Sequence, residues 1–138
     1  MPASLDASTE QHDWSLDGHR ITQLCVDAAS CRLLTWTLEA SLEIRLGVPF
    51  RLTLADGTTR EIDPDAPEQT APLLTLISRE IQRLVVTRSG TLSVAMSDGS
   101  VLDVASHRHF EAFEVNGAGS LEGITYRAHI GGGQPWES

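Results

Sequence analysis

Short runs in which apolar and polar residues alternate fill most of this 138-residue chain, and turn residues separate them. Alternation with a period of two predicts half-buried β-strands, because successive strand side chains point to opposite faces of a sheet. Such runs occur at 20–26, 31–38, 42–46, 50–54, 58–62, 81–87, 91–96, 100–104, 110–115 and 124–129. The short connections predict a mainly β fold, an antiparallel hairpin meander that closes into a barrel or forms a curled sheet or sandwich.

Turn length decides which side chains share a face, because a slip of one residue moves every side chain to the other face. A three-residue loop at 55–57 places Phe50 opposite Ile62, and a loop of the same length at 97–99 aligns the apolar residues beside it. Both loops end in Gly, which readily adopts the left-handed conformation they need. A third such loop, at 39–41, would bring six apolar side chains onto one inner face: Leu34, Trp36, Leu38, Leu42, Ile44 and Leu46.

A helical pattern interrupts the strands in the middle of the chain. Leu73, Leu76 and Ile77 recur at helical spacing, and Thr70 is suited to cap the N-terminus of a helix. We therefore expect one short α-helix near residues 70–78, packed on the sheet through the three apolar side chains.

A faint repeat relates the two halves of the chain. Six apolar residues have an apolar counterpart 60 positions later, although the turns between them need gaps to match. Such coincidences also arise by chance in β-rich chains, so the pattern fits an internal duplication and an accidental likeness equally. The pairs are Ile21 and Ile81, Leu24 and Leu84, Val26 and Val86, Leu42 and Leu102, Ile44 and Val104, and Phe50 and Phe110.

The ends of the chain differ from its centre. Residues 1–13 contain neither a basic residue nor a hydrophobic block, which argues against an ordinary secretory signal and predicts a flexible tail. Residues 14–130 are expected to form a single β-rich domain, and residues 131–138 a glycine-rich C-terminal tail. No run is long and apolar enough to span a membrane, so we expect a cytoplasmic protein.

The two cysteines, Cys25 and Cys31, flank a four-residue turn at 27–30. In a hairpin closed by this turn, Val26 faces Cys31 and Cys25 faces Arg32, so the two thiols point to opposite faces. We expect no disulfide between them, in keeping with a reducing compartment.

The chain is strongly acidic. Nineteen Asp and Glu residues oppose ten basic residues, all of them Arg, which gives a formal net charge of -9. Such a surface repels phosphate backbones and anionic lipids, so we expect neither nucleic-acid binding nor membrane binding. The same field would speed association with a basic protein, although the charge also serves simply to keep a small protein soluble.

The most specific chemical pattern is His107-Arg108-His109, followed by Glu114. It resembles the first metal motif of the cupin β-barrels, in which two His side chains project from one face of a strand and a Glu follows. The later His of a cupin, set within a Pro-and-Gly motif, has no counterpart here. The alternatives are a metal or small ligand held by His107, His109 and Glu114, and a charged turn that faces solvent.

Motifs of enzymatic catalysis are missing from the sequence. It contains no Gly-x-Ser-x-Gly elbow, and neither cysteine has a histidine close in sequence. Asp63 and Asp65 flank Pro64 just before the expected helix, where turn formation and helix capping account for both carboxylates. We therefore expect a protein that is not an enzyme, with no catalytic residues and no cofactor.

Several short strings become distinctive when they are taken together: Leu16-Asp17-Gly18, Pro49-Phe50-Arg51-Leu52-Thr53, Asp56-Gly57, Asp63-Pro64, residues 92–99, Phe110-Glu111-Ala112-Phe113-Glu114-Val115, and Gly131-Gly132-Gly133 with Trp136. Over about residues 14–136 they resemble a family of small actinobacterial proteins catalogued as a domain of unknown function. The resemblance implies no activity for named residues. Some small acidic proteins of this general kind serve as immunity partners of bacterial toxins.

Two functional hypotheses follow. In the first, the chain is a protein-binding domain that neutralises a basic toxin or nuclease, with Glu111, Glu114 and Trp136 as candidate partner-binding residues. In the second, the interior of a barrel holds a metal or small ligand at His107, His109 and Glu114. A homodimer is a third alternative, because sheets of this kind expose strand edges.

Overall fold

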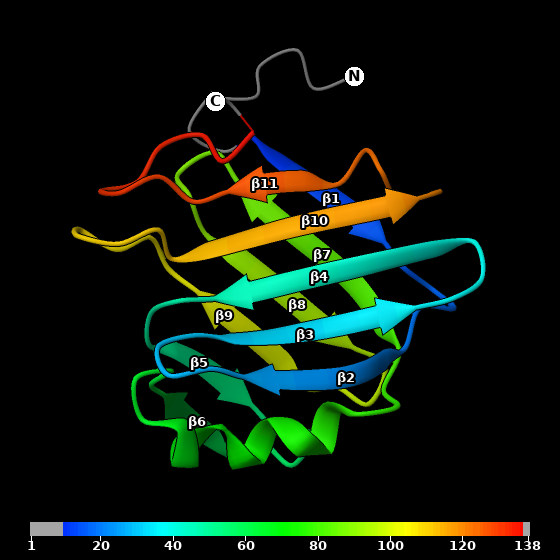
Figure 1. The fold of residues 1–138 in the computed structure, drawn as a ribbon, viewed down its shortest axis with the longest axis horizontal. Helices are drawn as coiled ribbons and strands as arrows, with labels where there is room; N and C mark the ends of the chain where they lie inside the picture. The colour runs from blue at the N-terminus through cyan, green and yellow to red at the C-terminus, as the bar shows by residue number, and fades with distance from the viewer. Residues whose placement is uncertain (1–9, 137–138) are drawn as a thin grey trace.

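Residues 10–136, which the computed structural model describes, form two antiparallel β-sheets packed face to face (Figure 1). Sheet 1 contains, in spatial order, β1 (Gln11–Ser15), β7 (Ile81–Thr87), β8 (Leu92–Met96), β9 (Val101–Val104), β5 (Phe50–Thr53) and β6 (Thr59–Ile62). Sheet 2 contains β11 (Thr125–Arg127), β10 (Phe113–Gly119), β4 (Ala40–Leu46), β3 (Cys31–Trp36) and β2 (Ile21–Val26). The predicted mainly β fold is confirmed, as a sandwich of two open sheets over this range.

The hydrophobic core lies between the two sheets. Alternate side chains of each strand are buried there, as in β4, where Leu42, Ile44 and Leu46 are almost fully covered. Phe113 of β10 joins the same cluster with no exposed surface. In Figure 1 the strands of sheet 2 run across the front, and β7, β8 and β9 cross behind them at an angle.

Two of the predicted hairpin registers are confirmed. Phe50 lies opposite Ile62, and Leu92 lies opposite Val104 through the β8–β9 pairing. The glycine of each loop adopts a positive φ, as a three-residue loop of this kind requires.

The predicted register around the cysteines is also confirmed. Val26 pairs with Cys31, and Cys25 pairs with Arg32. The two thiols therefore lie on opposite faces of the β2–β3 hairpin, and both are free.

The predicted register of the β3–β4 hairpin is wrong. Trp36 pairs with Ser41 rather than with Ile44, because the loop is shorter than expected and the Thr37 N–H donates to the Ala40 carbonyl. The Thr37 hydroxyl also accepts a hydrogen bond from the Ala40 N–H, which holds the tight turn closed. The slip turns Trp36 and Leu38 outward, with exposed fractions of 64% and 93%.

The two halves of the chain repeat the same arrangement. The meander β2–β3–β4 of the first half matches β7–β8–β9 of the second. In each half, the hairpin that follows the meander belongs to the other sheet: β5–β6 lies beside β9, and β10–β11 lies beside β4. A bulge follows Ile21 in β2 and Ile81 in β7, 60 positions apart. The Ile21 N–H donates to the Arg79 carbonyl and the Ile81 N–H to the His19 carbonyl, both at 2.9 Å. These paired features support the internal duplication.

The two crossovers between the sheets break this symmetry. Residues 47–49 connect β4 to β5, whereas residues 105–112 connect β9 to β10, so the second crossover has five residues more (eight against three). The counterpart of Phe50, which opens β5, is therefore Phe113, which opens β10, and not Phe110 as the repeat of 60 suggested. Phe110 was also expected inside a strand, but it lies in the longer crossover.

The predicted short helix is present as a 3-10 helix, η2 (Pro67–Leu76). Leu73 and Leu76 are fully buried, as expected, and η2 contacts β2. The predicted cap at Thr70 is wrong, because the helix begins earlier and its first residue is a proline, whose fixed φ suits that position. The Thr70 hydroxyl donates to the Pro67 carbonyl at 2.6 Å instead.

Both predicted tails pack on the domain where the structure describes them. Strand β1 begins at Gln11, inside the predicted tail 1–13, and pairs with β7. At the other end, the Arg127 N–H donates to the Pro135 carbonyl, and Trp136 stacks on His12 with ring centroids 3.9 Å apart. The remainder of these tails, 1–9 and 137–138, lies outside the described residues.

Within residues 10–136, no helix is long and apolar enough to cross a membrane.

Candidate functional site

The five site candidates from the sequence line two adjoining surface hollows. The first, of about 640 Å³, we call the crossover hollow; it includes His107, His109 and Glu111. The second, of about 450 Å³, we call the C-terminal hollow; it includes Glu111, Glu114 and Trp136. Glu111 belongs to both, so the two hollows meet at this residue.

The crossover hollow forms where the two crossovers run side by side. The Gly47 N–H of the short crossover donates to the Ala112 carbonyl of the long one at 3.0 Å. The hollow is lined by Ala29, Arg45, Gly47, Val48, Pro49, Asp63, Asp65, His107, His109, Phe110, Glu111 and Ile130. The extra residues of the long crossover therefore supply much of one wall.

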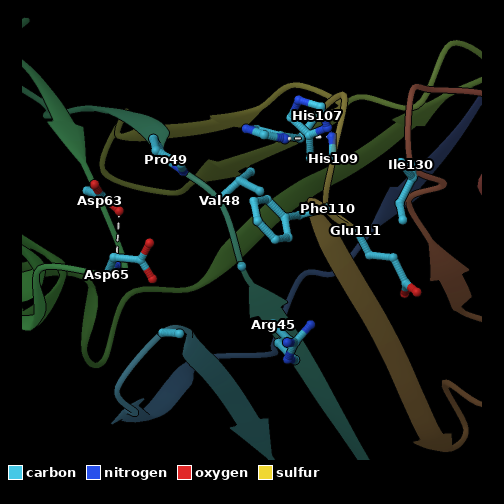
Figure 2. Close-up of a pocket in the computed structure, with 12 residues that line it drawn as sticks. Arg45, Val48, Pro49, Asp63, Asp65, His107, His109, Phe110, Glu111 and Ile130 are labelled. Atoms are coloured by element: carbon cyan, nitrogen blue, oxygen red, sulfur yellow. Dashed lines mark hydrogen bonds between the residues drawn. The ribbon is translucent and has the colours of Figure 1, made fainter.

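Two large apolar side chains of this hollow face solvent. Phe110 is 61% exposed and Ile130 is 58% exposed. Figure 2 shows Phe110 beside Val48 in the middle of the hollow, with Asp63 and Asp65 toward one side and Ile130 toward the other. An exposed aromatic side chain with carboxylates nearby provides an apolar anchor point inside a polar rim.

The Asp63 carboxylate is held by a turn, as expected, whereas the expected helix capping is wrong because the N-cap is Ala66 and has no side-chain cap. The Asp63 carboxylate accepts a hydrogen bond from the Asp65 N–H at 2.9 Å, and the Asp63 N–H donates to the Gln69 side chain at 3.0 Å. Neither carboxylate takes part in any of the ion pairs found within residues 10–136. Both can therefore meet a cationic group of another molecule without first breaking an ion pair within the described residues.

The two histidines of the crossover hollow contact each other. The His107 ring accepts a hydrogen bond from the His109 N–H through Nδ1, and the two ring centroids lie 6.0 Å apart. Both residues lie in the crossover and not on a strand, so the same-face argument behind the cupin resemblance does not apply. No cluster of three or more potential ligands occurs among the described residues.

Glu114, the third residue of that hypothetical metal site, is held elsewhere. Its carboxylate lies 3.0 Å from Arg127 Nε, and it also accepts a hydrogen bond from the Asn116 side chain. Arg127 Nε lies 3.4 Å from the Glu111 carboxylate as well. Glu111 and Glu114, two of the expected partner-binding residues, thus share one internal cation in the C-terminal hollow.

Trp136, the third partner-binding candidate, is anchored to its own domain. It stacks on His12, and His12 Nδ1 lies 2.8 Å from the Tyr126 hydroxyl. The same hydroxyl accepts a hydrogen bond from Trp14 Nε1 at 2.7 Å. Burial raises the pKa of Tyr126 above its ordinary value, while the Trp14 hydrogen bond opposes this shift.

The glycines before Trp136 allow this tail to pass close to the domain. Gly131, Gly132 and Gly133 all have positive φ, and the Gly131 N–H donates to the His107 carbonyl at 2.7 Å. A side chain at Gly132 would lie 3.3 Å from the Ser89 carbonyl oxygen. Gly132 therefore lets the backbone approach Ser89 closely, whereas a side chain at Gly131 would meet nothing within 4 Å.

A family model matches residues 12–124 of the chain, which include all of the crossover hollow except Ile130. The chain belongs to DUF6188, a family of unknown function. No curated protein and no solved structure matches it. Within this DUF6188 chain, Tyr126 and Trp136 lie beyond the matched segment.

Sequence reasoning missed the roles of two parts of the DUF6188 site. Phe110 was expected in a strand and is instead exposed in the hollow. Asp63 and Asp65 were expected only as turn residues, because their position opposite the long crossover depends on the fold. Aligning the two halves on Phe50 and Phe113 would have revealed an insertion around Phe110.

Proposed function

We propose that this DUF6188 domain is a non-catalytic binding module that docks a basic protein at the crossover hollow. The observation that carries the proposal is the exposure of Phe110 in a hollow that also holds the carboxylates of Asp63 and Asp65, neither of which forms an ion pair within residues 10–136. The net charge of -9 supports the same choice of partner.

The physical basis is an apolar anchor with a charged rim. Burying an exposed aromatic side chain in a partner releases its hydration and commonly supplies a large share of binding energy. Carboxylates at the rim select partners of opposite charge and speed their approach, whereas they repel acidic proteins. The long crossover is the part of the duplicated fold that adds this anchor, which fits the tendency of loops to carry function on a rigid scaffold.

The partner class we propose is a basic toxin or nuclease, for which the domain would act as an immunity protein. An active cleft that binds nucleic acid is basic, because it must attract phosphates. Asp63 and Asp65 would occupy the cationic groups of such a cleft, and Phe110 would fill an apolar depression beside them.

The test starts with affinity capture from the native host at low and high salt, followed by identification of the captured protein. Binding is then measured with that purified protein against the native chain, Phe110→Ala and Asp65→Asn. We expect Phe110→Ala to weaken binding by about thirty-fold. Asp65→Asn should weaken it less and reduce its dependence on salt.

Asp103→Asn is the matched control, because Asp103 is an exposed carboxylate on the outer face of sheet 1, opposite Arg51. It should leave the affinity unchanged. Capture of no partner, or of acidic proteins alone, would refute the proposal, as would a basic partner whose affinity is indifferent to Phe110→Ala.

A further inference from the structure

The outer face of sheet 2 carries an exposed tryptophan that the core does not use. Trp36 of β3 lies in a cross-strand row with Ser41 of β4 and Ala118 of β10. Its side chain is 64% exposed, although Trp is among the residues that proteins most often cover. Beside it lies a hollow of about 380 Å³, lined in part by Leu34 and Ala118.

The next two rows of the same face carry most of its charge. One row places Glu43 of β4 between Leu34 and Asn116. The other places Arg45 of β4 between Arg32 of β3 and Glu114 of β10.

Arg45 has no carboxylate partner within the described range. Arg32 lies 3.6 Å from Glu43, and Glu114 is held by Arg127. Arg45 is therefore left beside Arg32, a like charge, although the chain as a whole is strongly acidic.

We propose that a second copy of this chain packs on the outer face of sheet 2, with the two-fold axis running along β4. Strand β4 is the central strand of this sheet, with β10 on one side and β3 on the other. The axis therefore places β3 of each copy over β10 of the other copy. Each Trp36 then lies over Ala118 of the second copy, where a small side chain borders the hollow.

The charges of the face agree with this axis. The same operation places Arg32 of each copy over Glu114 of the other. Arg45 and Glu43 lie on the axial strand, where each directly faces its own copy. Because they are two residues apart on one face, each Arg45 side chain can reach diagonally to Glu43 of the other copy. An isologous interface needs such self-complementarity, with a large side chain facing a small one and each cation within reach of an anion.

This surface meets the crossover hollow at Arg45, but its centre lies elsewhere. The Trp36 row crosses β4 at Ser41, whereas the hollow borders β4 at Arg45, near the other end of the strand. The dimer therefore does not depend on the proposed binding of a basic protein. It also uses a sheet face, and not the strand edges that the sequence suggested.

The first test measures the molar mass of the full chain by sedimentation equilibrium and light scattering at up to about 100 μM, a range that detects interfaces of modest size. We expect a dimer. Trp36→Ala should weaken dimerisation by about thirty-fold, and Ala118→Arg should abolish it by filling the hollow. Both positions are exposed, so circular dichroism should show an unchanged fold.

Leu38→Ala is the control, because Leu38 is exposed at the tip of the same hairpin, outside the three rows. It should leave the dimer intact. A chain that stays monomeric over this range, or a dimer that survives both Trp36→Ala and Ala118→Arg, would overturn the proposal.

A second test fixes the geometry by cross-linking Trp36→Cys with Ala118→Cys, in a Cys25→Ser background. Within one copy the two positions are two strands apart, about 10 Å, which is too far for a disulfide. Oxidation of the double variant should therefore give covalent dimers on a non-reducing gel, and neither single variant should. Failure of the double variant to cross-link would rule out the proposed axis.

Discussion

Trp14 of β1 donates a hydrogen bond of 2.7 Å from its indole Nε1 to the hydroxyl of Tyr126 in β11. The bond joins the edge strands of two different sheets, because β1 closes one end of sheet 1 and β11 one end of sheet 2. His12 lies 2.8 Å from the same hydroxyl, and Trp136 stacks on His12. One phenol thus links both edges and the C-terminal segment.

Replacing Tyr126 by Phe should destabilise the domain by about 1–2 kcal/mol, since two part-buried polar groups lose their partner while the aromatic packing remains. Urea unfolding followed by tryptophan fluorescence measures the change. Thr125→Ala, at an exposed neighbour in the same strand, should shift stability by less than about 0.5 kcal/mol. Equal effects of the two substitutions would show that the hydroxyl does not link the sheets.

Thr35 offers the opposite case, a buried hydroxyl without a partner. Its Oγ1 makes no hydrogen bond among the described residues, and its side chain is almost fully covered. Thr35→Val should therefore stabilise the protein by about 1 kcal/mol, because it removes an unsatisfied group and keeps the shape. Thr70→Val is the matched comparison, since Thr70 is equally buried but donates to the Pro67 carbonyl. We expect this second substitution to lower the thermal midpoint, and destabilisation by both would contradict the argument.

The thiol of Cys31 should make stability fall in alkali. Burial raises the pKa of Cys31 from 9.0 to about 11, and the nearby charge of Asp27 adds to this effect. Because the pKa of Cys31 is higher in the folded state than in the unfolded state, its contribution to the free energy of unfolding is complete below pH 9. This contribution is lost as the pH rises toward 11. The slope approaches about 1.4 kcal/mol per pH unit in that window.

Urea unfolding at pH 8, 9 and 10 checks this slope by comparison with Cys31→Ala. The comparison is needed because Tyr126, whose pKa is also raised, contributes with the same sign. The variant should be less stable at pH 8, and the difference should shrink as the pH rises. A difference that stays constant from pH 8 to 10 would show that Cys31 does not titrate as proposed.

The packing of the 3-10 helix on the core should depend on Leu76 and not on Leu74. Leu76 is fully buried and Leu74 is 60% exposed. Leu76→Ala should cost about 2–5 kcal/mol of stability, and Leu76→Asp should prevent folding, because it buries an unpaired charge. Leu74→Ala should change stability by less than about 0.5 kcal/mol. A folded Leu76→Asp chain by circular dichroism would show that η2 is not part of the core.

The sequence predicted hairpins well where turn chemistry was unambiguous. The loops ending in Gly57 and Gly99 need a positive φ, so glycine at these positions marks the loop length. The predicted register of the β3–β4 hairpin was wrong because both faces of β3 carry apolar residues. The alternation therefore could not decide whether Leu33 or Leu34 faces the core. Strand β1 was missed because Trp14 is its one large apolar residue.

The residues of the crossover hollow were predicted only in part, because residue type is visible in the sequence and exposure is not. His107, His109 and Glu111 were singled out by residue type, and the fold does place them in one hollow. The exposure of Phe110 could not be read from its sequence, because a phenylalanine near a strand is usually buried. Only the length difference between the two crossovers explains why it faces solvent.

That length difference leads to a prediction that joins the fold to the proposed function. Deleting residues 106–110 leaves Ala105, Glu111 and Ala112, a crossover of three residues like 47–49. The Ala112 carbonyl that accepts from Gly47 is kept, so circular dichroism and thermal unfolding should show a folded domain. Binding of a basic partner should be lost with Phe110, whereas the dimer on sheet 2 should persist. An unfolded deletion variant would show that the long crossover is needed for the fold and is not an addition to it, and retained partner binding would place the docking surface elsewhere.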